Sequence, residues 1–263
     1  ALGHDVRLVL PRARGVMPHA GARVAWRDRV PWGVGSVDVC MLAERLPGAR
    51  GVEVRLVDAE PLATSPVYGG ADEADRYMLL ASAALVDCLR PGATWTPDVI
   101  QAHDWHAAAA ILQVARRRAR REPLGDVRTV LTVHNLEPSE VNLLGRALAL
   151  ADHVTAVSPT FAWEITTPEG GFGLDGVLRA RGDAVSGIVN GIDVRAFDPA
   201  RDPRIASRFS ARSLDRRVRN RHALGDALRL DIRRETPIVG VVSRLVEQKG
   251  LDILLAAAPA LLE

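Results

Sequence analysis

Residues 99–135 contain two short apolar runs that each end in a polar cluster: VIQAHDWH at residues 99–106 and TVLTVHN at residues 129–135. Between them, the alanine-rich segment Ala107–Arg120 has helical periodicity. A strand, a helix and a second strand in this order predict a βαβ unit with two parallel strands. Both polar clusters then follow the carboxyl ends of strands, which is where open α/β sheets bind their ligands.

The same alternation continues along the chain in both directions. Helical periodicity is found at Glu73–Leu89 and Asn142–Leu150. Besides Val99–Ala102 and Thr129–Val133, further strands are predicted at Val6–Leu10, Val52–Val57, His153–Val157, Ala184–Val189 and Ile238–Val242. Strands that alternate with helices favour an α/β fold with a parallel, doubly wound sheet.

Changes in composition divide the chain into three parts. We expect a Rossmann-like domain at residues 1–192, a polar connector rich in Arg and Asp at 193–236, and the start of a second Rossmann-like domain at 237–263. Residues 1–5 are typical of the tail of a helix that leads into the second strand of a βαβ unit. The first strand of domain 1–192 is therefore expected to be missing, and the chain is expected to be a fragment of a longer protein.

Composition argues against several classes of protein. The formal charge is only +2 and aromatic residues make up 4% of the chain, so no basic stripe with interleaved aromatics indicates nucleic-acid binding. The run Arg116–Arg121 is predicted to be a solvated helix end. Cys40 and Cys88 form no CxxC motif, which favours a reducing cytoplasm. No signal peptide or long apolar span indicates export or a membrane.

Histidines and carboxylates at the two strand ends raise the question of a metal site. Imidazole and carboxylate groups are suitable ligands, but the pattern is not the helical H-E-x-x-H arrangement and no further cluster completes a site. We therefore expect no metal at the candidate ligands, which are His103, Asp104, His106 and His134.

Two further motifs lie in the carboxyl-terminal part of the chain. Asn190-Gly191 follows a predicted buried strand and is, taken alone, a turn signal. Arg244 and Lys249 flank a predicted strand-to-helix loop, and Lys249 is the only lysine among 34 basic residues. Two cations beside a helix N-terminus suit a diphosphate, while two solvated charges on a surface loop are an equal alternative.

Together these motifs resemble those of the bacterial glycogen synthases and plant starch synthases. The resemblance covers nearly the whole chain and is closest in the segments 151–160, 167–178 and 241–252. It implies the GT-B fold, in which two Rossmann-like domains face each other across a cleft. The family members are retaining hexosyltransferases that move glucose from ADP-glucose to the non-reducing end of an α-1,4-glucan, such as glycogen or a maltooligosaccharide. No cofactor is implied.

The resemblance also implies roles for individual residues. Arg244 and Lys249 would hold the ADP diphosphate and stabilise the leaving group. Asp104, His134 and Asn190 would surround the transferred glucose, so that the implied catalytic residues are Asp104, His134, Arg244 and Lys249. The further residues implied to bind substrate are His103, Trp105, Asn135 and Gly191.

The sequence departs from the family pattern at three places. The family's Lys-x-Gly-Gly-Leu loop would precede Ala1, and its second-domain acidic motif would follow Glu263, so we expect the fragment alone to be inactive. The loop after His134 is also short, because residues 137–140 pass almost directly into the next helix. Two alternatives stay open: a related GT-B transferase with another nucleotide sugar or a small acceptor, and a non-catalytic module that binds sugar nucleotides or glucan.

Overall fold

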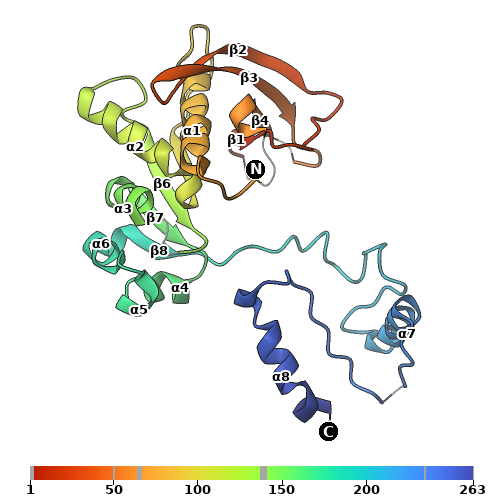
Figure 1. Ribbon diagram of the computed structural model, residues 1–263. Coiled ribbons are helices and arrows are strands. Elements are labelled where there is room, and N and C mark those ends of the chain that lie inside the picture. The colour runs from red at the N-terminus through yellow and green to blue at the C-terminus, as the bar shows by residue number, and fades with distance from the viewer. Residues whose placement is uncertain (1–2, 50, 64–66, 137–140, 234, 263) are drawn as a thin grey trace. The chain divides into compact units, whose positions relative to one another are not determined.

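A computed structural model describes residues 3–49, 51–63, 67–136, 141–233 and 235–262 of the protein. The chain divides into two compact units, residues 1–190 and 191–263 (Figure 1). All of the strands assigned in the described residues belong to the first unit, where they form two four-stranded sheets. This unit therefore contains the predicted βαβ elements and both polar clusters.

The first sheet has the strand order β1-β4-β3-β2. Its strands are β1 (Val6–Pro11), β2 (Arg23–Trp32), β3 (Gly35–Arg45) and β4 (Val52–Asp58). β1 and β4 were predicted and pair in parallel, whereas β3 is antiparallel to both of its neighbours. The expectation of a wholly parallel sheet is wrong here, because the unpredicted β2–β3 hairpin extends this sheet on the far side of β4.

The second sheet is parallel throughout, with the order β5-β6-β7-β8. Its strands are β5 (Val99–His103), β6 (Arg128–Val133), β7 (His153–Ala156) and β8 (Val185–Gly187). Each matches a predicted strand, although β8 is shorter than the predicted Ala184–Val189. The near-continuous apolar character of β6 has a simple cause: Leu131 and Val133 are fully buried.

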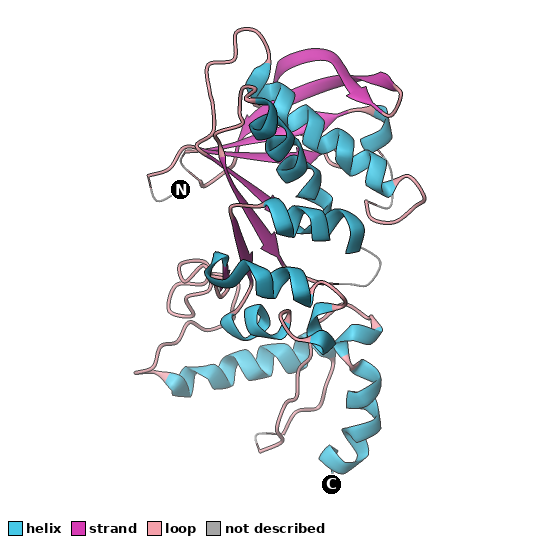
Figure 2. Ribbon diagram, turned by 90° about the vertical axis from the view of Figure 1, so that its left-hand side faces the viewer, coloured by secondary structure: helices cyan, strands magenta, loops and turns pink. Residues whose placement is uncertain are grey.

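Helices lie beside both sheets (Figure 2). α1 and α2 contact each other, and side chains from both helices together with β1 and β5 line a cavity of about 170 Å³. The main apolar core lies between the second sheet and α2, α3 and α6. The helices of the first unit, with two 3₁₀ turns, are α1 (Glu73–Leu89), α2 (Asp104–Arg120), α3 (Val141–Leu150), α4 (Pro159–Glu164), α5 (Pro168–Gly171), α6 (Asp175–Arg181), η1 (Glu60–Leu62) and η3 (Gly182–Ala184).

A buried carboxylate ties α1 to the first sheet. The side chain of Asp87 is only 2% exposed and accepts a hydrogen bond of 2.7 Å from the indole N–H of Trp26 on β2. Arg7 on β1 and Arg55 on β4 each place a guanidinium nitrogen 3.3 Å from Asp87 Oδ2. Burial lowers the pKa of Arg55, and Asp87 opposes that shift. A buried charge of this kind is tolerated because it is paired and hydrogen-bonded.

The basic end of α2 differs from its prediction. Arg118 donates to the carbonyl oxygens of Gly125 and Val127 and to both carboxylate oxygens of Asp152, at 2.9 and 3.3 Å. The expectation of a wholly solvated helix end is therefore wrong for Arg118, because the chain folds back beneath the helix and supplies acceptors. The exposed Arg116 fits the prediction.

The second unit is helical where it has regular structure. It contains η4 (Leu214–Arg216), α7 (Arg217–Leu228), η5 (Glu247–Lys249) and α8 (Leu251–Leu262). The strand predicted at Ile238–Val242 is absent from the described chain, and four of its five residues are apolar yet all five are exposed. A strand needs a hydrogen-bonded neighbour, and residues 191–233 and 235–262 supply none. In the described parts of the chain, no helix is both long enough and apolar enough to span a bilayer.

Candidate active site

The two polar clusters meet at one end of the second sheet. β5 and β6 pair in parallel with His103 opposite Thr132, so both strands end at the same edge. The imidazoles of His103 and His134 are joined there by a bond of 2.9 Å between Nδ1 and Nε2. This juxtaposition confirms the prediction that the two clusters open on the same edge of one parallel sheet.

Asp104 organises the backbone that follows β6. It is the first residue of α2, and its φ of 53° lies in the left-handed region, which Asp tolerates better than most residues. Its Oδ1 accepts the backbone N–H of His134 at 2.7 Å and that of Asn135 at 3.4 Å. One carboxylate oxygen thus fixes the chain at the end of the neighbouring strand. Within the described residues, Oδ2 carries no hydrogen bond.

His103 and His106 have lowered pKa values and are therefore poor bases. Burial, and then the proximity of His134, lower the pKa of His103, while Asp104 opposes the shift. Burial likewise lowers the pKa of His106, with Glu73 and Asp104 opposing it. Both imidazoles are therefore neutral at pH 7. A neutral imidazole has one donor and one acceptor nitrogen, which suits hydroxyl groups better than a phosphate.

Trp105 was expected to bind substrate, and this expectation stays a prediction. It is partly buried against the main core and stacks on His106, with ring centroids 4.3 Å apart. Three residues that the sequence did not single out also contact His106. Glu73 Oε1 lies 3.8 Å from its Nε2, and the rings of Tyr68 and Tyr77 meet it edge-on. No local sequence pattern indicates these contacts, because the two tyrosines lie 29 and 38 residues before His106.

Asn190 follows β8, the fourth strand of the same sheet. The approach of β8 to α4 is so close that a Cβ on Gly187 would lie 2.2 Å from the carbonyl oxygen of Ser158, so only glycine fits. Ile188 continues the ladder by donating to the carbonyl of Ala156. The side chain of Asn190 is exposed, and in the described residues it is not hydrogen-bonded to either histidine. Gly191 is the first residue of the second unit.

Arg244 and Lys249 belong to the second unit. Both side chains are exposed, and neither forms an ion pair with another described residue. Lys249 ends η5, and Gly250, with a φ of 62°, joins it to α8. The predicted helix is therefore present although the strand before it is not. The first N–H groups of α8 have no partner within the helix, which suits an anion, whereas Asp252 in its first turn competes for that position.

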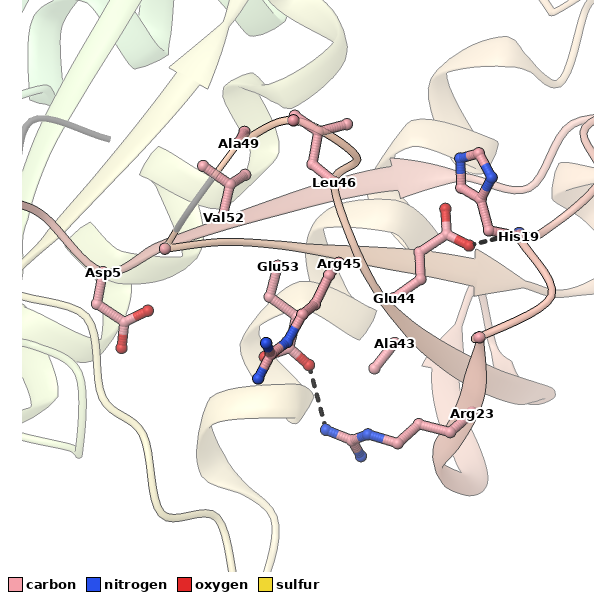
Figure 3. Close-up of a pocket in the computed structure, with 13 residues that line it drawn as sticks. Asp5, His19, Arg23, Ala43, Glu44, Arg45, Leu46, Ala49, Val52 and Glu53 are labelled. Atoms are coloured by element: carbon pink, nitrogen blue, oxygen red, sulfur yellow. Dashed lines mark hydrogen bonds and ion pairs between the residues drawn. The ribbon is translucent and has the colours of Figure 1, made fainter.

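A hollow of about 1040 Å³ lies elsewhere, beside the β3–β4 connection of the first sheet (Figure 3). Two of its carboxylates already have partners: Glu53 pairs with Arg23 at 3.3 Å, and Glu44 accepts the backbone N–H of His19 at 2.8 Å. We therefore place the candidate active site at the histidine pair, where hydrogen-bonding groups are left over. Among the described residues, no group of three His, Cys, Asp or Glu side chains is arranged to hold a metal ion.

The shortened loop after His134, at residues 137–140, lies outside the described residues. Its effect on the site therefore stays a prediction.

Comparison with known proteins identifies the family. The starch synthase catalytic domain matches residues 1–141 and 137–180. The glycogen synthases of Serratia proteamaculans and Cellvibrio japonicus are 36% and 33% identical over the whole chain, which spans 60% of their length. The catalytic domain of starch synthase IV from Arabidopsis thaliana, bound to ADP and acarbose, is 26% identical with a TM-score of 0.85, over 99% of this chain and 60% of that one. The fold is therefore of the GT-B glycosyltransferase type, and the chain belongs to the glycogen and starch synthase family.

Proposed function

We propose that this chain is part of a hexosyltransferase that moves glucose from ADP-glucose to the non-reducing end of an α-1,4-glucan with retention of configuration. The observation that carries the proposal is the His103–His134 pair, set by Asp104 at the carboxyl ends of parallel strands. The imidazole nitrogens of the pair can serve as hydrogen-bond donors and acceptors for sugar hydroxyls. Family membership gives the reaction class, and the related starch synthase bound to ADP and acarbose supports a nucleotide and a saccharide as ligands.

Bond cleavage sets the chemical demands on the site. Breaking the bond between glucose C1 and the phosphate oxygen builds negative charge on the diphosphate and oxocarbenium character on the sugar. We assign the diphosphate to Arg244 and Lys249, beside the free N–H groups of α8. These groups would stabilise the negative charge of the leaving diphosphate. We therefore propose that the reaction needs no cofactor, the sugar nucleotide being a substrate.

The remaining residues are assigned to the sugar. We assign Asp104 and His134 to the transferred glucose. The Oδ2 of Asp104, which accepts no hydrogen bond from the described residues, would accept a sugar hydroxyl or face the developing positive charge. The other residues that we assign to substrate binding are His103, Trp105, Asn135, Asn190 and Gly191.

The chain spans about 60% of the length of these relatives, so we propose the activity for the natural-length protein and not for the 263 residues alone. We expect the 263 residues alone to be inactive. We place the protein in the cytoplasm, where Cys40 and Cys88 would stay reduced, as both are free thiols in the structure.

The test is glucosyl transfer to glycogen by the natural-length protein, with ADP-glucose and UDP-glucose as competing donors. We expect ADP-glucose to be preferred and Lys249→Ala to lower kcat about 30-fold or more, which corresponds to roughly 2 kcal/mol of lost electrostatic stabilisation. Lys249→Arg should also be impaired, because a guanidinium cannot replace an ammonium at a tight site. Arg116→Ala, on the exposed face of α2, is the matched control. Binding of either donor without transfer would support the non-catalytic alternative instead.

A further inference from the structure

An unassigned loop lies beside the candidate active site, between η1 and α1. In its segment Val67–Gly70, Tyr68 is 66% exposed, and its ring meets that of His106 edge-on, with centroids 5.1 Å apart and an interplanar angle of 70°. His106 lies two residues after Asp104 on α2 and is close enough for the Asp104 charge to affect its pKa. The loop thus brings an exposed aromatic ring to the edge of the site.

Two buried side chains of α1 hold this loop by hydrogen bonds to its backbone. The Arg76 side chain is 5% exposed, and its two terminal nitrogens donate to the carbonyls of Val67, at 3.3 Å, and of Gly69. Tyr77 is 5% exposed, and its hydroxyl donates to the same Val67 carbonyl at 3.2 Å. Three hydrogen bonds therefore hold the carbonyls of Val67 and Gly69 toward α1, while the side chain of Tyr68, the residue between them, stays exposed.

The geometry explains why an arginine is found at position 76. Its planar fork reaches two carbonyls two residues apart, whereas a lysine ammonium is a point charge with no such geometry. The loop backbone is also specialised, because Gly69 and Gly70 have φ values of 88° and 100°. A Cβ on Gly70 would lie 3.1 Å from Asp72 Oδ1 and 3.6 Å from an Arg76 nitrogen.

Tyr77 connects this support to the site itself. Its ring meets His106 edge-on at 4.6 Å and Trp105 at 5.7 Å, while its hydroxyl holds the loop. A displacement of α1 would therefore move the Tyr77 ring against His106, and a displacement of the loop would move the Tyr68 ring. Glu73, in the first turn of α1, is a third residue of this region that contacts His106.

We propose that Arg76 and Tyr77 are positioning residues, which fix Val67–Gly70 so that Tyr68 stays against His106 beside the Asp104-organised site. This inference rests on the proposed function in one respect: the ring so placed would meet the acceptor sugar, whose apolar face suits an exposed aromatic ring. Neither Arg76 nor Tyr77 needs to touch a ligand for this role.

The first test is independent of any activity. In NMR spectra of the 263-residue chain, Tyr68→Leu defines the change in the His106 ring-proton shifts when the tyrosine ring is lost. We expect Arg76→Lys to move the same resonances in the same direction by at least half as much, and Arg116→Lys on α2 to leave them in place. Unchanged His106 resonances in Arg76→Lys, with a clear change in Tyr68→Leu, would overturn the proposal. Should Arg76→Lys fail to fold, Tyr77→Phe keeps both ring contacts, removes only the bond to Val67, and should give a smaller shift of the same sign.

The second test uses transfer by the natural-length protein. Arg76→Lys should raise the KM for the glucan acceptor about tenfold with kcat within about twofold of wild type, and Tyr68→Leu should do the same. A merely structural role would instead lower kcat with the fraction of folded protein and leave KM unchanged, which would overturn the proposal. If the wild-type protein transfers no glucose, the proposed function fails, and the NMR comparison alone decides the positioning role.

Discussion

The two ends of the second sheet each carry an aspartate that accepts backbone N–H groups, and they use it differently. At the amino end, Asp152 accepts two bonds from Arg118 and further bonds from the Thr129 N–H, at 2.8 Å, and its hydroxyl, at 2.9 Å. At the carboxyl end, the hydrogen bonds that Asp104 accepts from described residues come from the two N–H groups after β6 alone. The first carboxylate is saturated and paired with arginine, while the Oδ2 of Asp104, beside two imidazoles, has no hydrogen bond from any residue that the structure describes. A parallel sheet thus separates the end that holds the fold from the end that is open to a ligand.

The pKa values follow the same division. Burial alone would raise the pKa of Asp152, but the hydrogen bonds from Arg118 and Thr129 outweigh it and lower the pKa from 3.8 to about 2. At the other end, burial lowers the pKa of His103 and keeps that ring uncharged. Charge is therefore concentrated on Asp152 at the amino end, whereas the imidazole of His103 at the carboxyl end stays neutral.

The largest expected effect tests whether the amino end holds the fold. Asp152→Ala should lower the free energy of unfolding of the 263-residue chain by about 2–3 kcal/mol, because it removes charge-assisted bonds to Arg118 and Thr129. Urea denaturation measures this difference, with Asp126→Ala at an exposed position as the control. The folded pKa lies below the unfolded one, so the contribution is complete above about pH 4 and disappears as the pH falls through about 2. A difference that does not shrink over this range would assign the stability to another group.

An intermediate effect tests whether Asp104 positions the strand end without stabilising the whole unit. Asp104→Ala should speed hydrogen exchange at the His134 and Asn135 amides about tenfold, while the free energy of unfolding changes by less than about 1 kcal/mol. Asp104→Asn keeps an acceptor oxygen and should give a smaller change. Loss of global stability as large as that of Asp152→Ala would show that the two ends do not differ.

The smallest expected effect concerns the coupling of the two histidines. His134→Ala should raise the pKa of His103 but leave it below 6.5, because burial is the larger cause of the shift and remains. NMR titration of the His103 ring protons measures it. Because the folded pKa is lowered, stability falls as the pH drops from about 6.5 through the folded value, and the variant should lose less over that window. A His103 pKa that falls in the variant would contradict the assigned cause.

The sequence correctly predicted that the two polar clusters share one edge of a parallel sheet, because the signals for this arrangement are local. An apolar run that ends in His103 and Asp104 indicates a strand and its exposed end within a few residues. The β2–β3 hairpin was missed because Arg27, Asp28 and Arg29 make β2 look like a polar loop. Its formation depends on distant partners, such as the bond between Trp26 and Asp87.

The errors at Arg118 and at Ile238–Val242 have the same origin. The acceptors of Arg118 come from a later part of the chain, so its immediate neighbours indicated only solvent. Ile238–Val242 has strand-like composition, but pairing requires a partner that local sequence does not reveal. The contacts of His106 with Tyr68 and Tyr77 were likewise out of reach, because they join α2 to a loop and helix that precede it by some thirty residues or more.

The placement of both tyrosines against one imidazole gives the protein an optical signature. Tyr68 and Tyr77 are the only phenols in the chain, and both meet His106 edge-on. Phenolate absorbance on alkaline titration therefore arises from this cluster alone, with no background from the rest of the molecule. Burial, followed by the charges of Tyr68 and Glu73, raises the pKa of Tyr77 to about 12, so its share of the signal emerges only in strongly alkaline solution. A ligand that covers the exposed ring of Tyr68 would change the ultraviolet difference spectrum without any added dye.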